Sequence, residues 1–477
     1  MSFITRRKPL DLAAPHAEHL QLRRTLSWPH LVALGVGAIV GTGIYTLIGV
    51  GAGLAGPGVM LAFVLAGAVC VFAALCYAEL ATLMPAAGSA YTYSYAALGE
   101  FIAWIVGWSL LLEYSVVCSA VAVGWSDYAI EFLNGVGVHL PHALTNGPHA
   151  GGLFNLPAVA IIAVVAGLLA VGTRESAAVN AALVLVKVTA LAVFVAIALP
   201  AFNGANFTPF MPNGLYADQI VDAKIVKVGV LPAASIIFFA FYGFDAVSTA
   251  AEEVKRPERD LAIGIIGSML VCTAIYMVVG AAAIGAMPYQ DLAAAKGPLA
   301  HVMRVLGHPF AAAIVAGAAV VALPTVILAF MYGQSRIFFV MARDGLLPRS
   351  LATVNKRTGS PLTMTFATAI FVGAIAGFFP LGEVAALANA GTLAAFIAVG
   401  ASLIVLRVRE PSRPRAFRAP LGVLMGVLAI LGCGYLFATL PAKTQLYFIV
   451  AQAIGLLLYF AYGVRRSQLA QKSAGAT

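Results

Sequence analysis

The sequence predicts an all-α polytopic membrane protein with twelve transmembrane helices. They form an inverted repeat of five plus five helices, with helices 1 and 6 broken, followed by two accessory helices. Three observations predict this class: the composition, the spacing of the apolar runs and a pair of matched helix breaks. Of the 477 residues, 61% are hydrophobic and only 10% are charged, whereas a soluble protein carries about 25% charged residues. The chain is therefore expected to lie largely within lipid.

Apolar runs near the roughly 20 residues that a membrane requires occur twelve times along the chain. They lie at about 32–54, 59–83, 100–133, 156–171, 179–200, 230–252, 262–287, 308–341, 363–379, 382–406, 420–440 and 445–463. The third and eighth runs are too long for one perpendicular crossing. Tilted helices that extend past the bilayer are therefore expected there.

Basic residues indicate how the twelve helices are oriented. If the N-terminus is cytoplasmic and the helices alternate, 22 of the 28 lysines and arginines fall on the cytoplasmic side, five fall outside, and Lys187 lies within a span. This asymmetry follows the positive-inside rule. It predicts a multi-pass protein of the cell (inner) membrane with both termini in the cytoplasm. No apolar segment with a small-residue cleavage site precedes the first run, so no cleaved signal is expected.

The order of the spans divides the chain into five parts. We expect a cytoplasmic tail over 1–30, a first repeat over 31–200, a second repeat over 230–406, spans 11 and 12 over 420–463, and a cytoplasmic tail over 464–477. Because each repeat has five spans, an odd number, the second enters the membrane upside down relative to the first. Spans 1 and 6 then occupy corresponding positions.

Glycines interrupt the first span of each repeat. The stretch GAIVGTGIYTLIG, residues 37–49, carries Gly41 and Gly43, and FFAFYGFDAVSTAAEE, residues 238–253, carries Gly243. Glycine is a weak helix former, so both helices are expected to unwind there. Close helix packing by the same glycines is the alternative. Interrupted helices at matched positions of inverted halves indicate the central site of a transporter, and Gly41 and Gly243 are expected to have gating or structural roles.

The unwound backbone offers both hydrogen-bond donors and hydrogen-bond acceptors to a substrate. Amides at the start of the outer half of span 1 suit a carboxylate; they belong to Thr42, Gly43 and Ile44. Carbonyls left free at the two breaks suit an ammonium group; they belong to Ile39, Val40, Phe239, Ala240 and Tyr242. A carboxylate site a few ångströms from an ammonium site describes an α-amino acid.

Five long motifs occur in order from about residue 22 to 465. They are GAIVGTGIYTLIG, YAELATLMPAAGSAYTY, LLEYSVVCSAVAVGWSDY, FFAFYGFDAVSTAAEEVKRPERDL and YGQSRIFFVMARDGLLP. With these motifs the sequence resembles the amino acid–polyamine–organocation (APC) superfamily, and most closely its cationic amino acid transporter-like branch. The resemblance implies a LeuT-type inverted-repeat fold and secondary transport of amino acids, coupled to protons in many bacterial members. The superfamily also contains exchangers.

The resemblance also implies which residues hold the backbone of the substrate. They are Ile39, Thr42 and Gly43 at the first break, and Phe239, Ala240 and Tyr242 at the second. Tyr242 departs from the smaller aliphatic residues that are common at its position. Its phenol either shrinks the side-chain pocket or adds a hydroxyl to it, so the size of the substrate stays open.

Lys187, in the stretch AALVLVKVTALAVF, lies in the middle of the fifth span. An intramembrane lysine is costly and is by default a functional hypothesis. The resemblance places it where sodium sits in sodium-coupled relatives, donating to carbonyls of span 1. Burial disfavours its charged form, so losing and gaining a proton would couple transport to that proton. A permanently charged strut between spans 5 and 1 is the alternative.

Carboxylates occur both deep in the spans and near their cytoplasmic ends. Glu113 in span 3 is either a counter-charge near the substrate or Lys187, or a protonated acid that bonds a neighbouring helix. Asp245 follows the second break and is expected to cap the inner half-helix. Glu252 and Glu253 lie beside the basic residues of 255–259, with which we expect ion pairs at an inner gate.

Spans 3 and 8 are expected to complete the substrate pocket with Leu112, Glu113, Leu323 and Thr325. Apart from the glutamate, these side chains are apolar or carry a hydroxyl. A cationic substrate would need a second negative group, so the pocket favours small or medium neutral L-amino acids such as alanine, carried by proton symport. The alternatives are an amino acid/amine exchanger, uptake of cationic amino acids and, less favoured, a non-transporting amino acid sensor.

Neither a cofactor nor a metal is expected. The eight histidines lack metal-ligand spacing within one helix, the five cysteines lie in apolar runs, and there is no glycine loop of the nucleotide-binding kind. We therefore expect a protein that is not an enzyme and binds no nucleic acid. Its expected partners are an amino acid, a proton and the lipid bilayer, while a small membrane subunit or a homo-oligomer is left open.

Overall fold

Long apolar helices form most of the chain. The computed structural model describes residues 6–9, 22–45, 47–135, 138–148, 151–221, 224–295, 297–355, 358, 360–379, 381–440 and 442–474. Within these residues, eight helical segments are long and apolar enough to cross a membrane: Leu47–Leu83, Glu100–Ser126, Ala177–Ala201, Val230–Thr249, Pro257–Ala286, Pro309–Arg343, Leu387–Arg409 and Ala442–Arg466. Four shorter apolar helices are Trp28–Ile39, Leu156–Val171, Leu362–Phe378 and Val423–Ala438. Each of these segments overlaps one or two of the predicted runs; the number of crossings itself stays a prediction.

The first predicted run is interrupted and is not one continuous helix. Its described helical segments are α1 (Trp28–Ile39), α2 (Thr42–Tyr45) and α3 (Leu47–Ala55). The interruption lies at Val40 and Gly41, where Val40 has extended backbone angles. The helix resumes at Thr42, so the break is shorter than the three residues that the glycines suggested.

The sixth predicted run is broken over a longer stretch. It consists of α10 (Val230–Ile237), η7 (Phe238–Ala240), a turn over 241–244, α11 (Asp245–Thr249) and η8 (Ala251–Glu253). Gly243 has a φ of +119°, which side chains with a Cβ rarely adopt. The turn therefore depends on glycine at this position.

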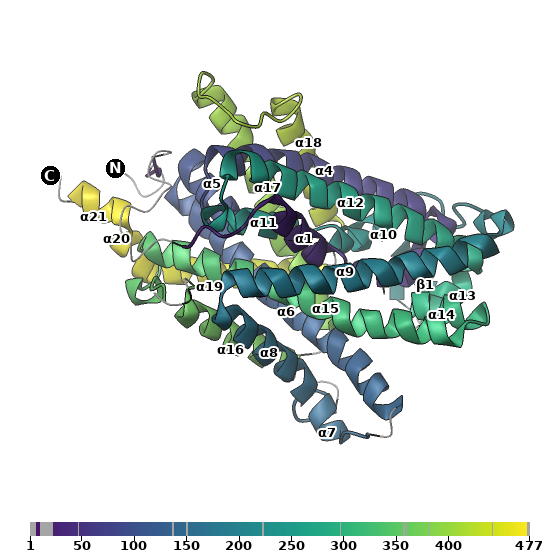
Figure 1. Cartoon of the computed structure of the whole chain (residues 1–477). Coiled ribbons are helices and arrows are strands. Elements are labelled where there is room, and N and C mark those ends of the chain that lie inside the picture. Colours follow the sequence, from purple (N-terminus) through teal and green to yellow (C-terminus); the bar gives the residue numbers. More distant parts are fainter. Residues whose placement is uncertain are drawn as a thin grey trace.

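The remaining helices surround the two broken segments (Figure 1). They include α4 (Val59–Leu83), α5 (Ala90–Ala97), α6 (Glu100–Gly135), α8 (Leu156–Val171), α9 (Thr173–Ala198), α12 (Pro257–Ala286), α15 (Pro309–Arg343), α16 (Leu362–Phe378), α17 (Leu381–Arg409), α18 (Val423–Ala438) and α19 (Ala442–Leu458). Helix α1 packs against α9, α12 and α15, while α6 packs against α15 and α17. The 36 residues of α6 span about 54 Å at 1.5 Å per residue, and this helix crosses the bundle obliquely in Figure 1.

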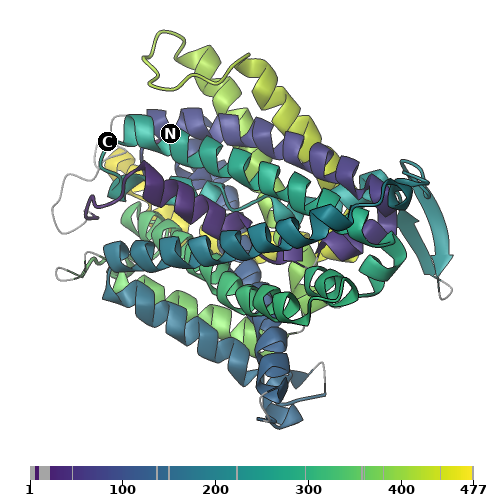
Figure 2. The ribbon, with the colours of Figure 1, turned by 45° about the vertical axis from the view of Figure 1, so that its right-hand side comes forward.

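The two ends of the bundle differ. The described segments nearest the two termini, 6–9 and 464–474, lie at one end, where Lys8 Nζ is 2.6 Å from Asp344 Oδ1 and Gln468 Nε2 donates to the Arg343 carbonyl over 2.6 Å (Figures 1 and 2). We call this the terminal end. The opposite end carries an antiparallel hairpin that the sequence did not predict, of β1 (Ala217–Val221) and β2 (Lys224–Val228). It also carries α13 (Tyr289–Ala294) and α14 (Pro298–Val305).

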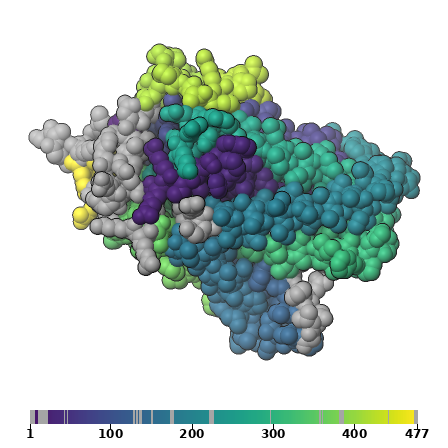
Figure 3. All heavy atoms as spheres, in the orientation of Figure 1, coloured from purple at the N-terminus to yellow at the C-terminus, as the bar shows by residue number. Residues whose placement is uncertain are grey.

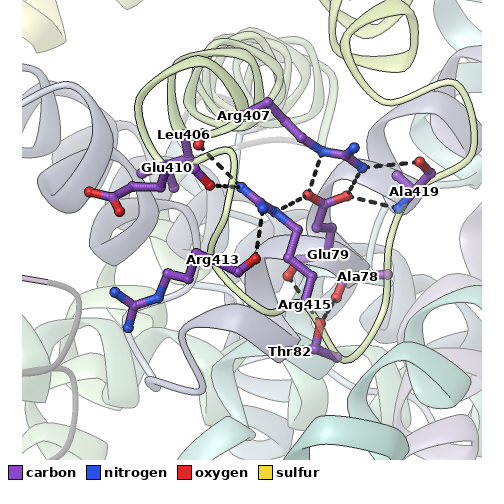
Figure 4. A network of polar contacts seen from close by, with 9 residues as sticks. All are labelled: Ala78, Glu79, Thr82, Leu406, Arg407, Glu410, Arg413, Arg415 and Ala419. Carbon is purple, nitrogen blue, oxygen red and sulfur yellow. Dashed lines mark hydrogen bonds and ion pairs between the residues drawn. The ribbon is translucent and has the colours of Figure 1, made fainter.

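A charged network joins α4 to the loop between α17 and α18 (Figure 4). Glu79 accepts from Arg407 Nε over 2.7 Å and from Nη2 over 2.5 Å, and the Ala419 amide donates to it over 2.8 Å. Arg415 Nε lies 2.9 Å from the same carboxylate. Two partly buried guanidinium groups thus share one carboxylate and fix the base of α18, which lies in the yellow-green ridge of Figure 3.

Candidate functional site

The two helix breaks meet in the middle of the bundle. An ideal Cβ on Gly43 would lie 2.4 Å from the Cβ of Ala240, and one on Gly243 would lie 2.9 Å from the Cβ of Ala38. Real Cβ atoms do not approach other atoms so closely. Glycine at these two positions therefore lets the backbones of the broken segments touch, which places the predicted breaks side by side.

A small cavity lies against both breaks. It is lined by Ala38, Ile39, Gly41, Gly43, Val117, Val121, Phe239, Tyr242, Val326 and Phe330. About 10 Å³ is open to the centre of a water molecule, which is about the least that holds one water. Only Phe239 among the lining residues is partly exposed. The cavity is too small for an amino acid, so side chains around it must move before a substrate enters.

Five of the predicted site residues line this cavity, namely Ile39, Gly41, Gly43, Phe239 and Tyr242. Sequence reasoning missed five others: Ala38, Val117, Val121, Val326 and Phe330. The last four form two pairs spaced four residues apart on α6 and α15, which puts each pair on one helix face. That spacing was a usable signal, although it is common in any buried helix.

Four residues expected in the pocket do not line the cavity: Leu112, Glu113, Leu323 and Thr325. The Glu113 Cβ faces α17, where an ideal Cβ on Gly391 would lie 2.9 Å from it. Both carboxylate oxygens of Glu113 are buried and accept no hydrogen bond from the described residues. The side chain of Thr42 lies outside the described residues.

Lys187 is fully buried on α9 and points at the first break. Its Nζ donates to the Gly37 carbonyl over 2.9 Å, to the Val40 carbonyl over 2.5 Å and to Thr325 Oγ1 over 2.8 Å. An ammonium group has three N–H donors, and this geometry uses all three. A neutral amine has only two, so loss of a proton would release one contact. Thr325, which was expected in the pocket, thus contacts Lys187 in this structure.

The carbonyls expected to be free at the breaks are partly occupied. The hydroxyl of Tyr276, on α12, is 2.6 Å from the Ile39 oxygen and 2.9 Å from the Ala240 oxygen, and Lys187 contacts the Val40 oxygen. The expectation of a free carbonyl was wrong for Val40. It was also wrong for one of the other two at a time, because the phenol of Tyr276 has a single proton to donate. Among the expected amides, that of Ile44 is also used, since it donates to the Gly41 carbonyl over 3.2 Å.

Asp245 is not the cap of the inner half-helix. Phe244 occupies the cap position and its side chain makes no capping bond. Instead, Asp245 Oδ1 accepts from the Gly243 amide over 3.1 Å, and its Oδ2 accepts from the hydroxyl of Tyr114. The carboxylate therefore fixes the turn of the second break and joins it to α6.

Ion pairs close the terminal end beneath the breaks, but with other partners than expected. Glu252 accepts two bonds from Arg343, of 2.6 and 2.8 Å, and Glu253 accepts from Arg336 over 2.9 Å. Both arginines come from α15, whereas the sequence suggested the basic residues of 255–259. All four side chains are nearly or fully buried.

The entry to α1 is joined to the exit from the second broken segment. The amides of Thr25 and Leu26 donate to the Glu253 carbonyl over 2.9 Å, and the Lys255 amide donates to the Leu26 carbonyl over 2.9 Å. These bonds form an isolated parallel bridge between Leu26 and Val254. The described residues include no group of three or more His, Cys, Asp or Glu side chains that could hold a metal ion.

Residues 26–459 match the family of amino acid permeases. The chain belongs to this family. The match confirms the resemblance drawn from the five motifs, and with the apolar helices it makes the permease a multi-pass membrane protein and not an enzyme.

Individual relatives cover the permease nearly from end to end. It is 43% identical to the branched-chain amino acid permease BcaP of Bacillus subtilis over 465 residues, which are 97% of each chain. It is 39% identical to the methylthioribose transporter of Bacillus subtilis over 98% of this chain and 100% of the relative. The vacuolar cationic amino acid transporter 2 of Arabidopsis thaliana is 36% identical over 86% of this chain and 64% of its own length.

Proposed function

We propose that the permease is a secondary active transporter that carries small or medium neutral L-amino acids together with protons by alternating access. The observation that carries this proposal is the contact of Lys187 Nζ with the Gly37 and Val40 carbonyls at the first break. A titratable donor bound to the backbone of a broken helix links protonation to the conformation of that helix. Under this proposal the twelve runs cross the inner membrane as two inverted repeats, 31–200 and 230–406, with both termini in the cytoplasm.

The substrate backbone is assigned to the two breaks. The amides of Thr42 and Gly43 receive the carboxylate. The carbonyls of Phe239 and Tyr242, with the remaining lone pairs of Ile39 and Ala240, receive the ammonium group. The substrate side chain then lies between α6 and α15, which present Val117, Val121, Val326 and Phe330.

The wall of the cavity favours a neutral substrate. Its described lining residues are apolar except for the Tyr242 hydroxyl, and an arginine or lysine substrate would need a negative group there. The relative named a branched-chain amino acid permease agrees with an apolar pocket. The relative named a methylthioribose transporter makes that neutral compound a second candidate. The buried hydroxyl of Tyr242, which has no hydrogen-bond partner among the described residues, favours this candidate.

Reconstitution into liposomes tests the proposal. Uptake of labelled alanine, isoleucine, arginine and methylthioribose is measured with and without a pH gradient, with and without sodium, into empty and preloaded vesicles. For a proton symporter we expect concentrative uptake of a neutral amino acid into empty vesicles, driven by the pH gradient and indifferent to sodium. Strong preference for arginine over alanine would overturn the neutral-substrate assignment.

The Lys187→Met variant tests the coupling. We expect it to lose pH-driven accumulation by at least tenfold, because methionine matches the lysine side chain as far as Cε but has no group that binds and releases a proton. The matched control is Lys443→Met, at the start of α19, which should behave as the native protein. Uptake only into preloaded vesicles, indifferent to pH, would show an exchanger in which Lys187 is a strut. Binding without any flux would show a sensor.

A further inference from the structure

A proline interrupts the hydrogen bonding of α15 beside the lysine site. Pro324 lies in the interior of this helix. Proline has no backbone N–H, so the carbonyl of Val320, four residues earlier, cannot receive the hydrogen bond that an α-helix normally supplies. The indole of Trp125, on α6, contacts this carbonyl instead, because its Nε1 donates to the Val320 oxygen over 2.8 Å. The indole thus replaces a missing backbone donor.

The residue after the proline is Thr325, whose hydroxyl reaches the first break. Its Oγ1 donates to the Gly37 carbonyl over 3.0 Å and accepts from Lys187 Nζ over 2.8 Å. Val320 and Thr325 are five residues apart, which is about 7.5 Å along the helix and about 140° around it. Helix α15 packs against both α6 and α9. Holding Val320 on the side that faces α6 therefore positions Thr325 on the side that faces α9.

The hydroxyl of Thr325 matters because the ammonium group of Lys187 has only neutral partners. Its acceptors are two carbonyls and this hydroxyl, and no ion pair among the described residues involves it. The titratable groups around it are the thiol of Cys272 and the phenol of Tyr276, on α12, and the phenol of Tyr45, on α2. Thiols and phenols are ordinarily uncharged at pH 7. Loss of one acceptor in three should therefore weaken the binding of the proton.

We infer that Trp125 is a positioning residue for the proton site. Its indole N–H replaces the donor that Pro324 lacks, and this keeps Thr325 against Lys187. The inference deepens the proposed function and rests on it, because it takes Lys187 as the group that binds the coupled proton. Without the indole N–H, the Val320 carbonyl has to find another donor and α15 shifts around it. Thr325 then moves away from Lys187, and the same pH gradient accumulates less substrate.

The test compares Trp125→Phe with the native protein in proteoliposomes. Phenylalanine keeps an aromatic ring and removes the N–H. Two rates are measured on the same vesicles: accumulation of labelled alanine driven by a pH gradient, and exchange of labelled for unlabelled alanine at equal pH. Their ratio does not depend on the amount of active protein. We expect the ratio to fall about threefold to tenfold, as for the loss of one hydrogen bond, with exchange unchanged within about twofold.

The matched control is Trp108→Phe. The indole of Trp108 also lies on α6 and donates to a carbonyl over 2.8 Å, but the acceptor is Ala451 of α19. This variant loses a contact of the same kind away from α15, so its ratio of accumulation to exchange should stay native. An equal fall in both variants would overturn the inference, because any lost indole contact on α6 would then weaken coupling.

Two double-mutant cycles test how the indole acts. Pro324→Ala returns a backbone N–H to the helix, so adding Trp125→Phe to it should change the ratio by less than about twofold. In the Thr325→Val background the hydroxyl is already absent, so adding Trp125→Phe should again lower the ratio no further. A full additional fall in either background would overturn the inference. Failure of the proposed function gives a different result, since the native protein would then show no pH-driven accumulation at all.

Discussion

At the scale of single residues, the site is built from side chains that satisfy the backbone of broken helices. Lys187 and Tyr276 come from α9 and α12 and fill carbonyls that an unbroken α1 would have bonded internally. Asp245 does the reverse at the second break, because its carboxylate accepts a hydrogen bond from the backbone amide of Gly243. These side chains therefore stabilise each break by themselves. A substrate can bind only to the backbone amides and carbonyls that they do not already contact.

The size of Tyr242 is expected to limit which side chains the permease accepts. Its ring lines the cavity, packs on Phe239 with centroids 4.9 Å apart, and carries a buried hydroxyl without a partner among the described residues. The Tyr242→Ile variant has a larger cavity. The concentration of isoleucine that halves uptake of labelled alanine should therefore fall about tenfold, which is a typical gain for one well-fitted methylene group. Tyr447→Ile, an exposed position on α19, is the control. If isoleucine inhibited uptake of labelled alanine no better in Tyr242→Ile than in the native protein, this role would be contradicted.

Residues with a local signal could be predicted, and residues defined by contact between helices could not. A lysine in an apolar run and glycines at matched positions stand out in the sequence itself, and they lie at the site. Tyr276 has no such signal, because its role depends on the rotation of α12 toward both breaks. The rotations of α6 and α15 likewise decide that Glu113 faces α17 and that Thr325 contacts Lys187, and neither residue lines the cavity.

At the scale of elements, the glycines act by letting two broken segments touch. In Gly43→Ala the new Cβ would lie 2.4 Å from the Cβ of Ala240, so the segments must separate. Overpacking of this kind costs about 1–3 kcal/mol, and we expect initial alanine uptake to fall at least tenfold. Gly167→Ala, on α8 where an added Cβ meets nothing within 4 Å, should transport normally. Normal transport by Gly43→Ala would show that the contact is not needed.

The helices were predictable as elements because long apolar runs have no alternative structure in lipid. The hairpin was missed, since its strands have only five residues each, show no strict alternation of apolar and polar residues, and lie in a long connection. The partners of Glu252 and Glu253 were also missed. The nearest basic residues in sequence lie in 255–259, but the folded chain brings α15 against this segment instead.

At the scale of the whole molecule, the terminal end is closed by buried ion pairs. Removing one partner of a buried pair costs about 3–5 kcal/mol if the other stays buried. In Glu252→Gln, Arg343 can regain water only when this end opens, so the open form should become more populated. A cysteine at Val326, which lines the cavity, should then react faster with a membrane-impermeant maleimide applied from the terminal end.

The measurement uses proteoliposomes whose orientation is read from a C-terminal tag. Glu410→Gln is the control, because Figure 4 shows the Glu410 carboxylate pointing away from the charged network around Glu79. An unchanged labelling rate, or faster labelling from the opposite end only, would mean that the Glu252–Arg343 pair does not hold the terminal end closed.

The bridge between Leu26 and Val254 limits how the broken segments can move. It joins them at the terminal end, and the contact of Gly43 with Ala240 joins them again at their centre. Two bodies connected at two points can turn only about the line through those points. We therefore expect the two broken segments to move together about this line, so that the two interruptions provide one mode of motion instead of two.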